Sequence, residues 1–220
     1  MFFLQVALNL IPAAQNTILL TLVCYPLALG VATSFATLRL LRVPVVSPLA
    51  AMVVDFIRIT PLLLQLLFVY YALPLVGVRL DAWPSAVATL ALHIGAYQSE
   101  IIRSSYLSVP TGLSEAARVL GMSNRLRVFR IVAPVALRVA IPPTATTLLD
   151  TFRSTAVVSL VGVTDILYQA QLVIQTNLAL GTGRGLITTP VFLMLMAFFV
   201  GLGYPAARLI RTLERKVALP

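Results

Sequence analysis

The amino-acid sequence predicts an all-α integral membrane protein with five transmembrane helices, its N-terminus outside and its C-terminus in the cytoplasm. Of the 220 residues, 60% are hydrophobic and only 10% are charged, and the mean hydropathy is +0.98. A soluble domain is about half apolar and about a quarter charged. The apolar residues gather in five segments of roughly 20 residues or more, which is the length that crosses a bilayer as a helix. The basic residues gather between alternate segments.

Each of the five segments is a predominantly apolar run bounded by polar or basic residues. A helix closes its backbone hydrogen bonds within the segment, as the hydrocarbon core of a bilayer requires. The fourth segment is the most polar of the five, and the second contains an internal proline. Because the chain has 220 residues, we expect one transmembrane domain over residues 1–220. The predicted spans are residues 14–38, 47–75, 85–107, 139–164 and 187–209.

The distribution of basic residues predicts the orientation. Lysine and arginine number 16 against 7 acidic residues, and cytoplasmic loops carry the excess of basic residues in membrane proteins. With the N-terminus outside, only Arg79 and Arg184 fall outside, while Arg58 and Arg153 lie within spans. Since the arginines lie beside apolar segments, we expect membrane lipid and not nucleic acid as a partner. The cytoplasmic residues are Arg39, Arg42, Arg103, Arg118, Arg125, Arg127, Arg130, Arg138, Arg208, Arg211, Arg215 and Lys216.

A basic segment at residues 108–138 separates the third and fourth spans and is predicted to be a cytoplasmic loop. Its first part, residues 113–120, reads as a short helix. Ser114 is a residue type that begins helices, and Gly121 is a residue type that ends them. The loop therefore contains a defined turn at the glycine.

A second short helix is predicted over residues 124–132. Ser123 precedes it as a cap, and we expect the helix to stop near Pro134. An ordinary basic loop on the cytoplasmic side would explain the arginines. It would not explain two helices, a glycine between them, and the adjacent small residues Ala116 and Ala117, which offer a surface that another protein could approach closely.

The spacing within this loop resembles the EAA loop of ABC importer permeases. The family pattern is EAA, three residues, G, nine residues, I, one residue, LP, and this sequence departs from it only where Ala133 replaces the leucine. The matching residues are Glu115-Ala116-Ala117, Gly121, Ile131 and Ala133-Pro134. The spacing is long and fixed, so chance matches are rare.

The resemblance implies that the loop is a coupling element, which docks on a cytoplasmic ATPase. The residues implied in this contact are Glu115, Ala116, Ala117, Arg118 and Gly121. ATP and Mg would then be bound by the partner ATPase, with no cofactor on this chain, and the chain itself would not be an enzyme. The sequence contains no P-loop of its own.

Further segments resemble the polar amino-acid subfamily of these permeases. Residues 58–66 read RITPLLLQL, where the subfamily reads RGTPLLVQL, and residues 96–103 read AYQSEIIR, where it reads AYxAEIxR. Residues 136–138 and 142–143 match its ALR and PP positions. Together the matches cover about residues 14–216.

The subfamily resemblance implies a subunit of a bacterial inner-membrane importer. Its partners would be two ATPases, a second permease subunit that is identical or homologous, and a solute-binding protein outside. Its substrate would be a polar or charged amino acid or an opine-like derivative. A self-contained channel or an ion-coupled carrier for a small polar solute is the alternative, and it would not need the EAA spacing.

Three predicted spans each contain an acid followed three residues later by an arginine, so that both side chains share one helix face. Ionised groups within a membrane are costly and usually face a bundle interior or a cavity. Glu100 and Arg103 lie near a predicted cytoplasmic end, where we expect a structural or gating ion pair. The other pairs are Asp55 with Arg58 and Asp150 with Arg153.

Asp150 and Arg153 form the pair that best fits a substrate path. Polar residues surround it, among them Thr147, Ser154 and Thr155, which a lipid-facing helix would not need. Our hypothesis is that Asp150 and Arg153 face the substrate, with a purely structural pair as the alternative. For Arg58, which precedes Thr60 and Pro61, structural and path roles both remain open. Gln65, Tyr97 and Gln98 are weaker path candidates, and His93 is expected to be a packed histidine.

Overall fold

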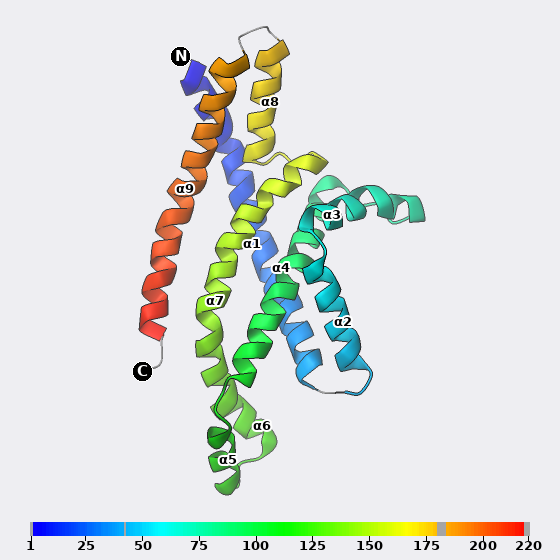
Figure 1. The fold of residues 1–220 in the computed structure, drawn as a ribbon, viewed down its shortest axis with the longest axis vertical. Coiled ribbons are helices and arrows are strands. Elements are labelled where there is room, and N and C mark those ends of the chain that lie inside the picture. Colours follow the sequence, from blue (N-terminus) through cyan, green and yellow to red (C-terminus); the bar gives the residue numbers. More distant parts are fainter. Residues whose placement is uncertain (1, 42, 180–183, 218–220) are drawn as a thin grey trace.

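The computed structural model describes residues 2–41, 43–179 and 184–217, and all regular elements in these ranges are helical. Figure 1 shows an elongated bundle in which α1 (Phe2–Leu40) runs through most of the length. α4 (Ala82–Leu107) packs on α1, and α7 (Ala133–Ser154) packs on α4. α2 (Val46–Ile59) lies beside α1 and α4, and α9 (Arg184–Val217) lies along α7.

Small residues allow α1 and α4 to approach closely. Ala28, Ala32 and Ala36 follow one another at every fourth position of α1, so they share one face, and all three are buried. A Cβ atom placed on Gly95 of α4 would lie 2.7 Å from Cγ1 of Val31 and 2.9 Å from the carbonyl oxygen of Ala28. Glycine at this position therefore sets the separation of the two helices, as small residues do between membrane helices.

The second predicted span is not one continuous helix. α2 ends at Ile59, and α3 (Leu62–Leu67) begins after a bend; the segment continues as a π turn (Phe68–Ala72) and a 3-10 turn (Leu73–Val76). The two halves meet at 104°. The break follows from Pro61, because the residue before a proline adopts an extended conformation, as Thr60 does with ψ 133°.

By length and composition, three helical segments of the described chain can cross a membrane: Leu8–Leu40, Asn124–Val161 and Ile187–Thr212. The bent segment Val46–Ile59 with Leu62–Val76 would add a fourth. The third predicted span does form a continuous helix, α4, but this helix is not among the candidates. It contains the polar residues His93, Gln98 and Glu100, which lower its hydropathy. The structure thus supports three or four spans, and a fifth stays a prediction.

The basic loop contains the two helices and the glycine turn, with corrected ends. α5 (Thr111–Val119) begins before Ser114, which lies inside the helix and does not cap it. Gly121 has φ +74°, and the amides of Gly121 and Met122 donate to the carbonyls of Arg118 and Ala117. This is the hydrogen-bond pattern of a helix that ends at a glycine.

The second helix of the loop does not stop near Pro134. α6 (Asn124–Arg127) is capped by Ser123, whose hydroxyl accepts a hydrogen bond from the amide of Leu126 at 3.4 Å. It continues through a π turn (Val128–Val132) directly into α7. Pro134 lies in the first turn of α7, and the π turn accommodates its missing amide hydrogen. The loop and α7 therefore form one helical segment.

A helix that was not predicted, α8 (Ile166–Ala179), follows a 3-10 turn (Thr155–Val161) at the end of α7. Asp165 caps it, because one carboxylate oxygen accepts a hydrogen bond from the amide of Tyr168 at 2.8 Å. The hydroxyl of Thr17 in α1 accepts another from the amide of Ile166 at 3.1 Å. Asn16 donates to the carbonyl of Thr164. These contacts fix α8 beside the first half of α1, at the end of the bundle opposite the basic loop (Figure 1).

Candidate functional site

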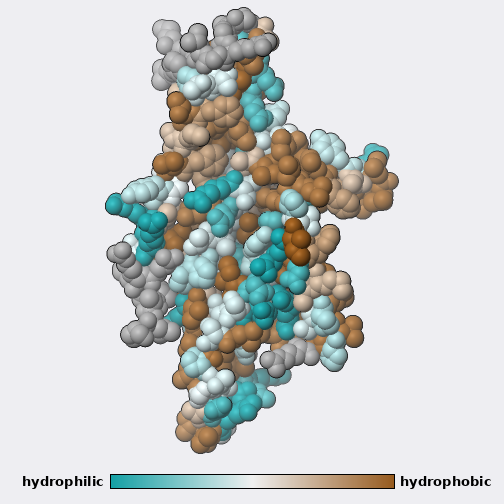
Figure 2. All heavy atoms as spheres, in the orientation of Figure 1, coloured by the Kyte–Doolittle hydropathy of each residue, from teal (hydrophilic) through white to brown (hydrophobic). Residues whose placement is uncertain are grey.

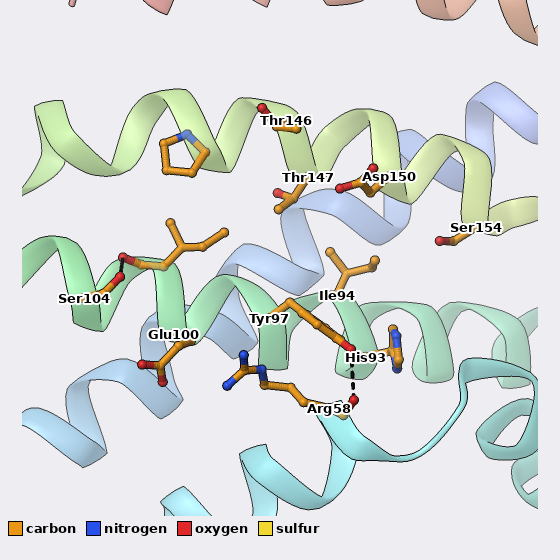
Figure 3. A pocket seen from close by; sticks show the side chains of 12 residues that line it. Arg58, His93, Ile94, Tyr97, Glu100, Ser104, Thr146, Thr147, Asp150 and Ser154 are labelled. Carbon is orange, nitrogen blue, oxygen red and sulfur yellow. Dashed lines mark hydrogen bonds between the residues drawn. The ribbon is translucent and has the colours of Figure 1, made fainter. Parts of the chain in front are cut away.

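A cavity of about 560 Å³ lies between α2, α4 and α7. It brings together half of the predicted path residues, because three helices that are distant in sequence contribute its walls. Figure 3 shows Asp150 and Arg58 on opposite walls, with α4 side chains between them. The polar and charged lining residues are Arg58, His93, Tyr97, Glu100, Ser104, Thr146, Thr147, Asp150 and Ser154.

Arg58 is loosely held. Its nearest carboxylate oxygen, on Asp55, is 3.9 Å away, which is beyond hydrogen-bond distance. Its guanidinium lies 5.4 Å from the centre of the Tyr97 ring, and the Tyr97 hydroxyl donates to the Arg58 carbonyl at 2.9 Å. The Nε atom of Arg58 is buried without a protein partner. The guanidinium therefore retains donors that an anionic group in the cavity could engage.

Asp150 on α7 provides the opposite charge. It forms an ion pair with Arg153 at 3.6 Å, but both side chains remain more than half exposed, at 54% and 66%. Asp150, Thr147 and Ser154 line the cavity, whereas Arg153 does not. Of the predicted pair, the structure places only the acid at the cavity. The cation at the cavity is Arg58, from a different helix.

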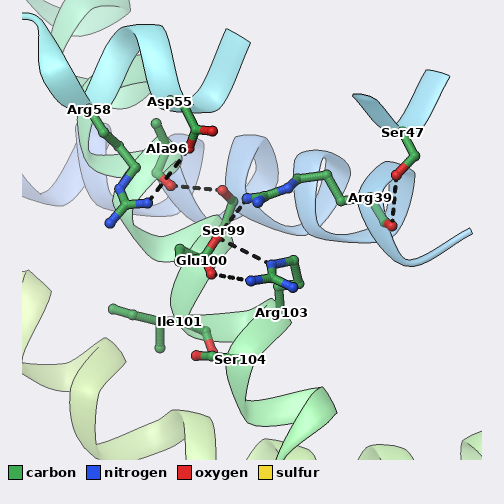
Figure 4. A network of polar contacts seen from close by, with 10 residues as sticks. All are labelled: Arg39, Ser47, Asp55, Arg58, Ala96, Ser99, Glu100, Ile101, Arg103 and Ser104. Carbon is green, nitrogen blue, oxygen red and sulfur yellow. Dashed lines mark hydrogen bonds and ion pairs between the residues drawn. The ribbon is translucent and has the colours of Figure 1, made fainter. Parts of the chain in front are cut away.

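Glu100 is at the centre of a tighter cluster, shown in Figure 4. One carboxylate oxygen accepts a hydrogen bond from Arg39 of α1 at 2.7 Å, and the other accepts one from Arg103 at 2.5 Å. The side chains of Arg39 and Glu100 are only 12% and 23% exposed. The pair of Glu100 with Arg103 was expected, but the role of Arg39 was missed. Since 61 positions separate Arg39 from Glu100, no local sequence pattern indicates the contact.

Other predicted path residues lie away from the cavity wall. Gln98 is fully buried and donates to the Thr147 hydroxyl at 2.7 Å. Thr155 is also fully buried and donates to the Phe152 carbonyl. The Thr60 hydroxyl donates to the Phe56 carbonyl within α2. These contacts join or stabilise helices, and a role of the three residues in the path stays a prediction.

Gln65 lies behind the cavity wall, and His93 lies in the wall. The amide nitrogen of Gln65 donates to the carbonyls of Ile57 and Thr60 at the break between α2 and α3. His93 was expected to be a packed histidine, and it does pack beside Tyr97 with ring centres 5.1 Å apart. It also lines the cavity, which the sequence did not indicate.

The loop between α4 and α7 presents apolar side chains at its tip. Val119 and Leu120 are 87% and 80% exposed at the end of α5. Glu115, Ala116 and Arg118 are exposed as well. Ala117 is only 3% exposed and packs within the loop, so the expectation that both alanines offer a contact surface is corrected: only Ala116 does so.

The chain matches the family model described as "Binding-protein-dependent transport system inner membrane component" over residues 25–219. It is 38% identical over 162 residues to the L-cystine transport system permease protein TcyB of Bacillus subtilis (strain 168), covering 74% of this chain and 69% of the relative. It is 33% identical over 178 residues to the probable glutamine ABC transporter permease protein GlnP of the same strain, covering 81% and 79%.

A third relative covers more of the chain. The nopaline transport system permease protein NocM of Agrobacterium fabrum (strain C58 / ATCC 33970) is 31% identical over 216 residues, covering 94% of this chain and 86% of the relative. Among solved structures, the fold resembles a crystal structure of an amino acid ABC transporter with histidines, with a TM-score of 0.88, 24% identity and coverage of 97% and 96%. The resemblance found in the EAA loop is confirmed, and a channel or carrier is not favoured. The chain belongs to the family of inner-membrane components of binding-protein-dependent transport systems, the permease subunits of ABC importers.

Proposed function

We propose that this chain moves polar or charged amino acids, or opine-like derivatives, through the bacterial inner membrane into the cytoplasm, and that the cavity between α2, α4 and α7 is part of the path. The observation that carries the proposal is the presence of Arg58 and Asp150 on opposite cavity walls. The names of the relatives, which include cystine, glutamine and nopaline transport proteins, support this class of substrate.

The two charged residues suit the two charged groups on the α-carbon of an amino acid. The guanidinium of Arg58 would bind the α-carboxylate, because arginine binds carboxylates through several N–H donors and its nearest carboxylate oxygen here is 3.9 Å away. The carboxylate of Asp150 would bind the α-ammonium group. Both contacts replace water that a zwitterion loses within a membrane, where an uncompensated charge is costly.

A second permease subunit would complete the path. Figure 2 shows hydrophilic side chains gathered in the middle of one face, over α7, α4 and α2, between apolar regions. The side chains of Asp150 and Arg153 on α7 are more than half exposed, and lipid does not solvate such groups. A second subunit, identical or homologous, would cover this face, so that the two chains enclose the substrate between them.

The loop of residues 108–138 would dock on one of two cytoplasmic ATPases, which would bind the ATP and Mg. Its exposed tip of Val119 and Leu120 offers apolar surface for such a contact. The loop continues into α7 as part of one helical segment, Asn124–Val161, and Asp150 lies on it. A displacement of the loop by the ATPase would therefore reach the cavity wall through a continuous helix, which is a direct route to alternating access.

The remaining features of the proposal concern the membrane. The N-terminus and α8 would face the outside, where a solute-binding protein delivers the substrate, and the basic loop would face the cytoplasm. α4 would count as the fifth span, since its polar residues face the cavity or neighbouring helices rather than lipid.

The experiment is uptake of radiolabelled amino acids into proteoliposomes that contain the assembled transporter with its ATPases and binding protein. We expect ATP-dependent uptake by the wild type and a loss of at least about tenfold in Arg58→Gln, which removes one charge-assisted contact. Asp81→Asn, at an exposed position before α4, is the matched control and should transport normally. Uptake without ATP, or normal uptake by Arg58→Gln, would contradict the proposal.

A further inference from the structure

The side-chain amide of Gln65 has a fixed orientation. Pro61 has no amide hydrogen, so the carbonyl of Ile57, four residues earlier, lacks its helical donor. The Gln65 nitrogen Nε2 donates to this carbonyl at 2.7 Å and to the carbonyl of Thr60 at 2.9 Å. Both partners are acceptors, so only the nitrogen can face them. The two N–H groups of the amide are thereby used, and the oxygen Oε1 faces the other way.

This orientation decides which nitrogen of His93 carries the proton. Nδ1 of His93 is 3.3 Å from Oε1 of Gln65. Because Oε1 can only accept a hydrogen bond, Nδ1 must donate, and it carries the proton. In a neutral imidazole the other nitrogen, Nε2, is then an acceptor. None of the hydrogen bonds in the described part of the chain uses this Nε2 atom, although His93 lines the cavity.

We propose that Nε2 of His93 accepts a hydrogen bond from an N–H group in the substrate's side chain, so that the cavity selects amino acids whose side chain ends in an amide or a guanidinium. The inference rests on the proposed function of the cavity. With the α-carboxylate on Arg58 and the α-ammonium on Asp150, the side chain is the part of the substrate that remains to be recognised.

The charge of the lining supports the same choice. Among the charged side chains that line the cavity, Glu100 and Asp150 are acidic and only Arg58 is basic. Nε2 of His93 adds an uncharged acceptor to this wall, beside Tyr97. A side-chain amide or guanidinium has N–H groups to donate to this acceptor, whereas a side-chain carboxylate has none and would lie in a cavity that Asp150 also lines.

The test uses the complex of permease and ATPase, purified in detergent without the binding protein, so that the selectivity of the binding protein does not contribute. Binding of radiolabelled L-glutamine is measured by equilibrium dialysis, with competition by L-2-amino-5-oxohexanoic acid. This analogue has a methyl group in place of the amide nitrogen of glutamine and keeps the rest of the molecule. L-arginine serves as a second radiolabelled probe.

Two substitutions separate the two nitrogens of His93. His93→Asn places an amide donor near the position of Nδ1 and leaves nothing at Nε2, whereas His93→Gln reaches the Nε2 position and loses the donor to Gln65. Leu92→Met, at the neighbouring exposed position of α4 that does not line this cavity, is the control. Co-elution of each variant with the ATPase shows that the complex is intact.

We expect the wild type, His93→Gln and Leu92→Met to prefer glutamine over the analogue by about 5- to 10-fold, the effect of one hydrogen bond. His93→Asn should show no preference. If His93→Asn keeps the preference, or if the wild type has none while it binds glutamine, the inference about His93 is overturned and the proposed function stands. If the wild type binds neither glutamine nor arginine, the inference about His93 is overturned, and the proposed function is overturned as well only if the proteoliposomes take up no polar amino acid.

Discussion

Two charged regions of this molecule share one sequence pattern but differ in burial and in how closely their charges are paired. Glu100–Arg103 and Asp150–Arg153 are both acid–arginine pairs three residues apart on a helix. Glu100 is largely buried and engaged by two arginines at 2.7 and 2.5 Å, whereas Asp150 is more than half exposed and 3.6 Å from its arginine. The Glu100 cluster joins α1 to α4, whereas the weakly paired Asp150 remains available to a ligand.

The difference comes from the neighbouring helix and not from the pair itself. α1 passes close to α4 and brings Arg39 to Glu100. No arginine of another helix reaches Asp150 among the ion pairs of the described chain. Equal spacing along a helix therefore predicts that two side chains share a face, but it does not predict how strongly they are bound.

The largest expected effect on stability is at the cluster of Arg39, Glu100 and Arg103. Glu100→Gln should lower the free energy of unfolding by about 3 kcal/mol, because it leaves two poorly exposed arginines without a carboxylate. Thermal unfolding in detergent measures the loss. Asp55→Asn is the matched control: it removes the exposed acid of the Asp55–Arg58 pair, and should cost less than about 1 kcal/mol. Equal losses in the two variants would show that the clusters do not differ in strength.

A smaller effect is expected from separating α1 and α4. Gly95→Ala places a Cβ atom 2.9 Å from the backbone oxygen of Ala28, so the helices must move apart and the contact of Arg39 with Glu100 must lengthen. The cost should be about 2 kcal/mol, as for other overpacked cores. Gly30→Ala, on α1, has open space around the new methyl group and is the control. A Gly95→Ala protein as stable as Gly30→Ala would refute the close approach.

The smallest effect on stability is expected at the Asp150–Arg153 pair. Asp150→Asn should change the free energy of unfolding by less than about 1 kcal/mol, since exposed ion pairs contribute little. Uptake by the assembled transporter should nevertheless fall at least about tenfold, because a charge-assisted contact to the substrate is lost. Parallel unfolding and uptake measurements check this. A large loss of stability with normal uptake would reverse the roles assigned to the two regions.

Arg153 is a sharper probe of the same pair. If the arginine only restrains Asp150, Arg153→Ala should reduce uptake less than Asp150→Asn does, whereas direct contact of both residues with the substrate would make the two losses similar. The distinction arises because the cavity wall includes Asp150 and not Arg153.

The sequence by itself determined the class of the protein and the two helices of the basic loop. Composition required helices in a membrane, and the spacing from Glu115 to Pro134 indicated the family, because such features are local and independent of packing. The turn at Gly121 was predictable for the same reason: a helix end with positive φ favours glycine. The second span was predicted as one segment; Pro61 explains why it breaks, and the 104° angle comes from the structure alone.

Only the tertiary structure decided which polar residues meet. The contact of Arg39 with Glu100, the burial of Gln98 and the presence of His93 at the cavity all depend on helices that are distant in sequence. Helix α8 was missed because its capping contacts come partly from Thr17, far away in the chain. A sequence pattern reports which side chains share a face, and the packing of α1, α2, α4 and α7 decides which faces are buried against each other and which enclose a cavity.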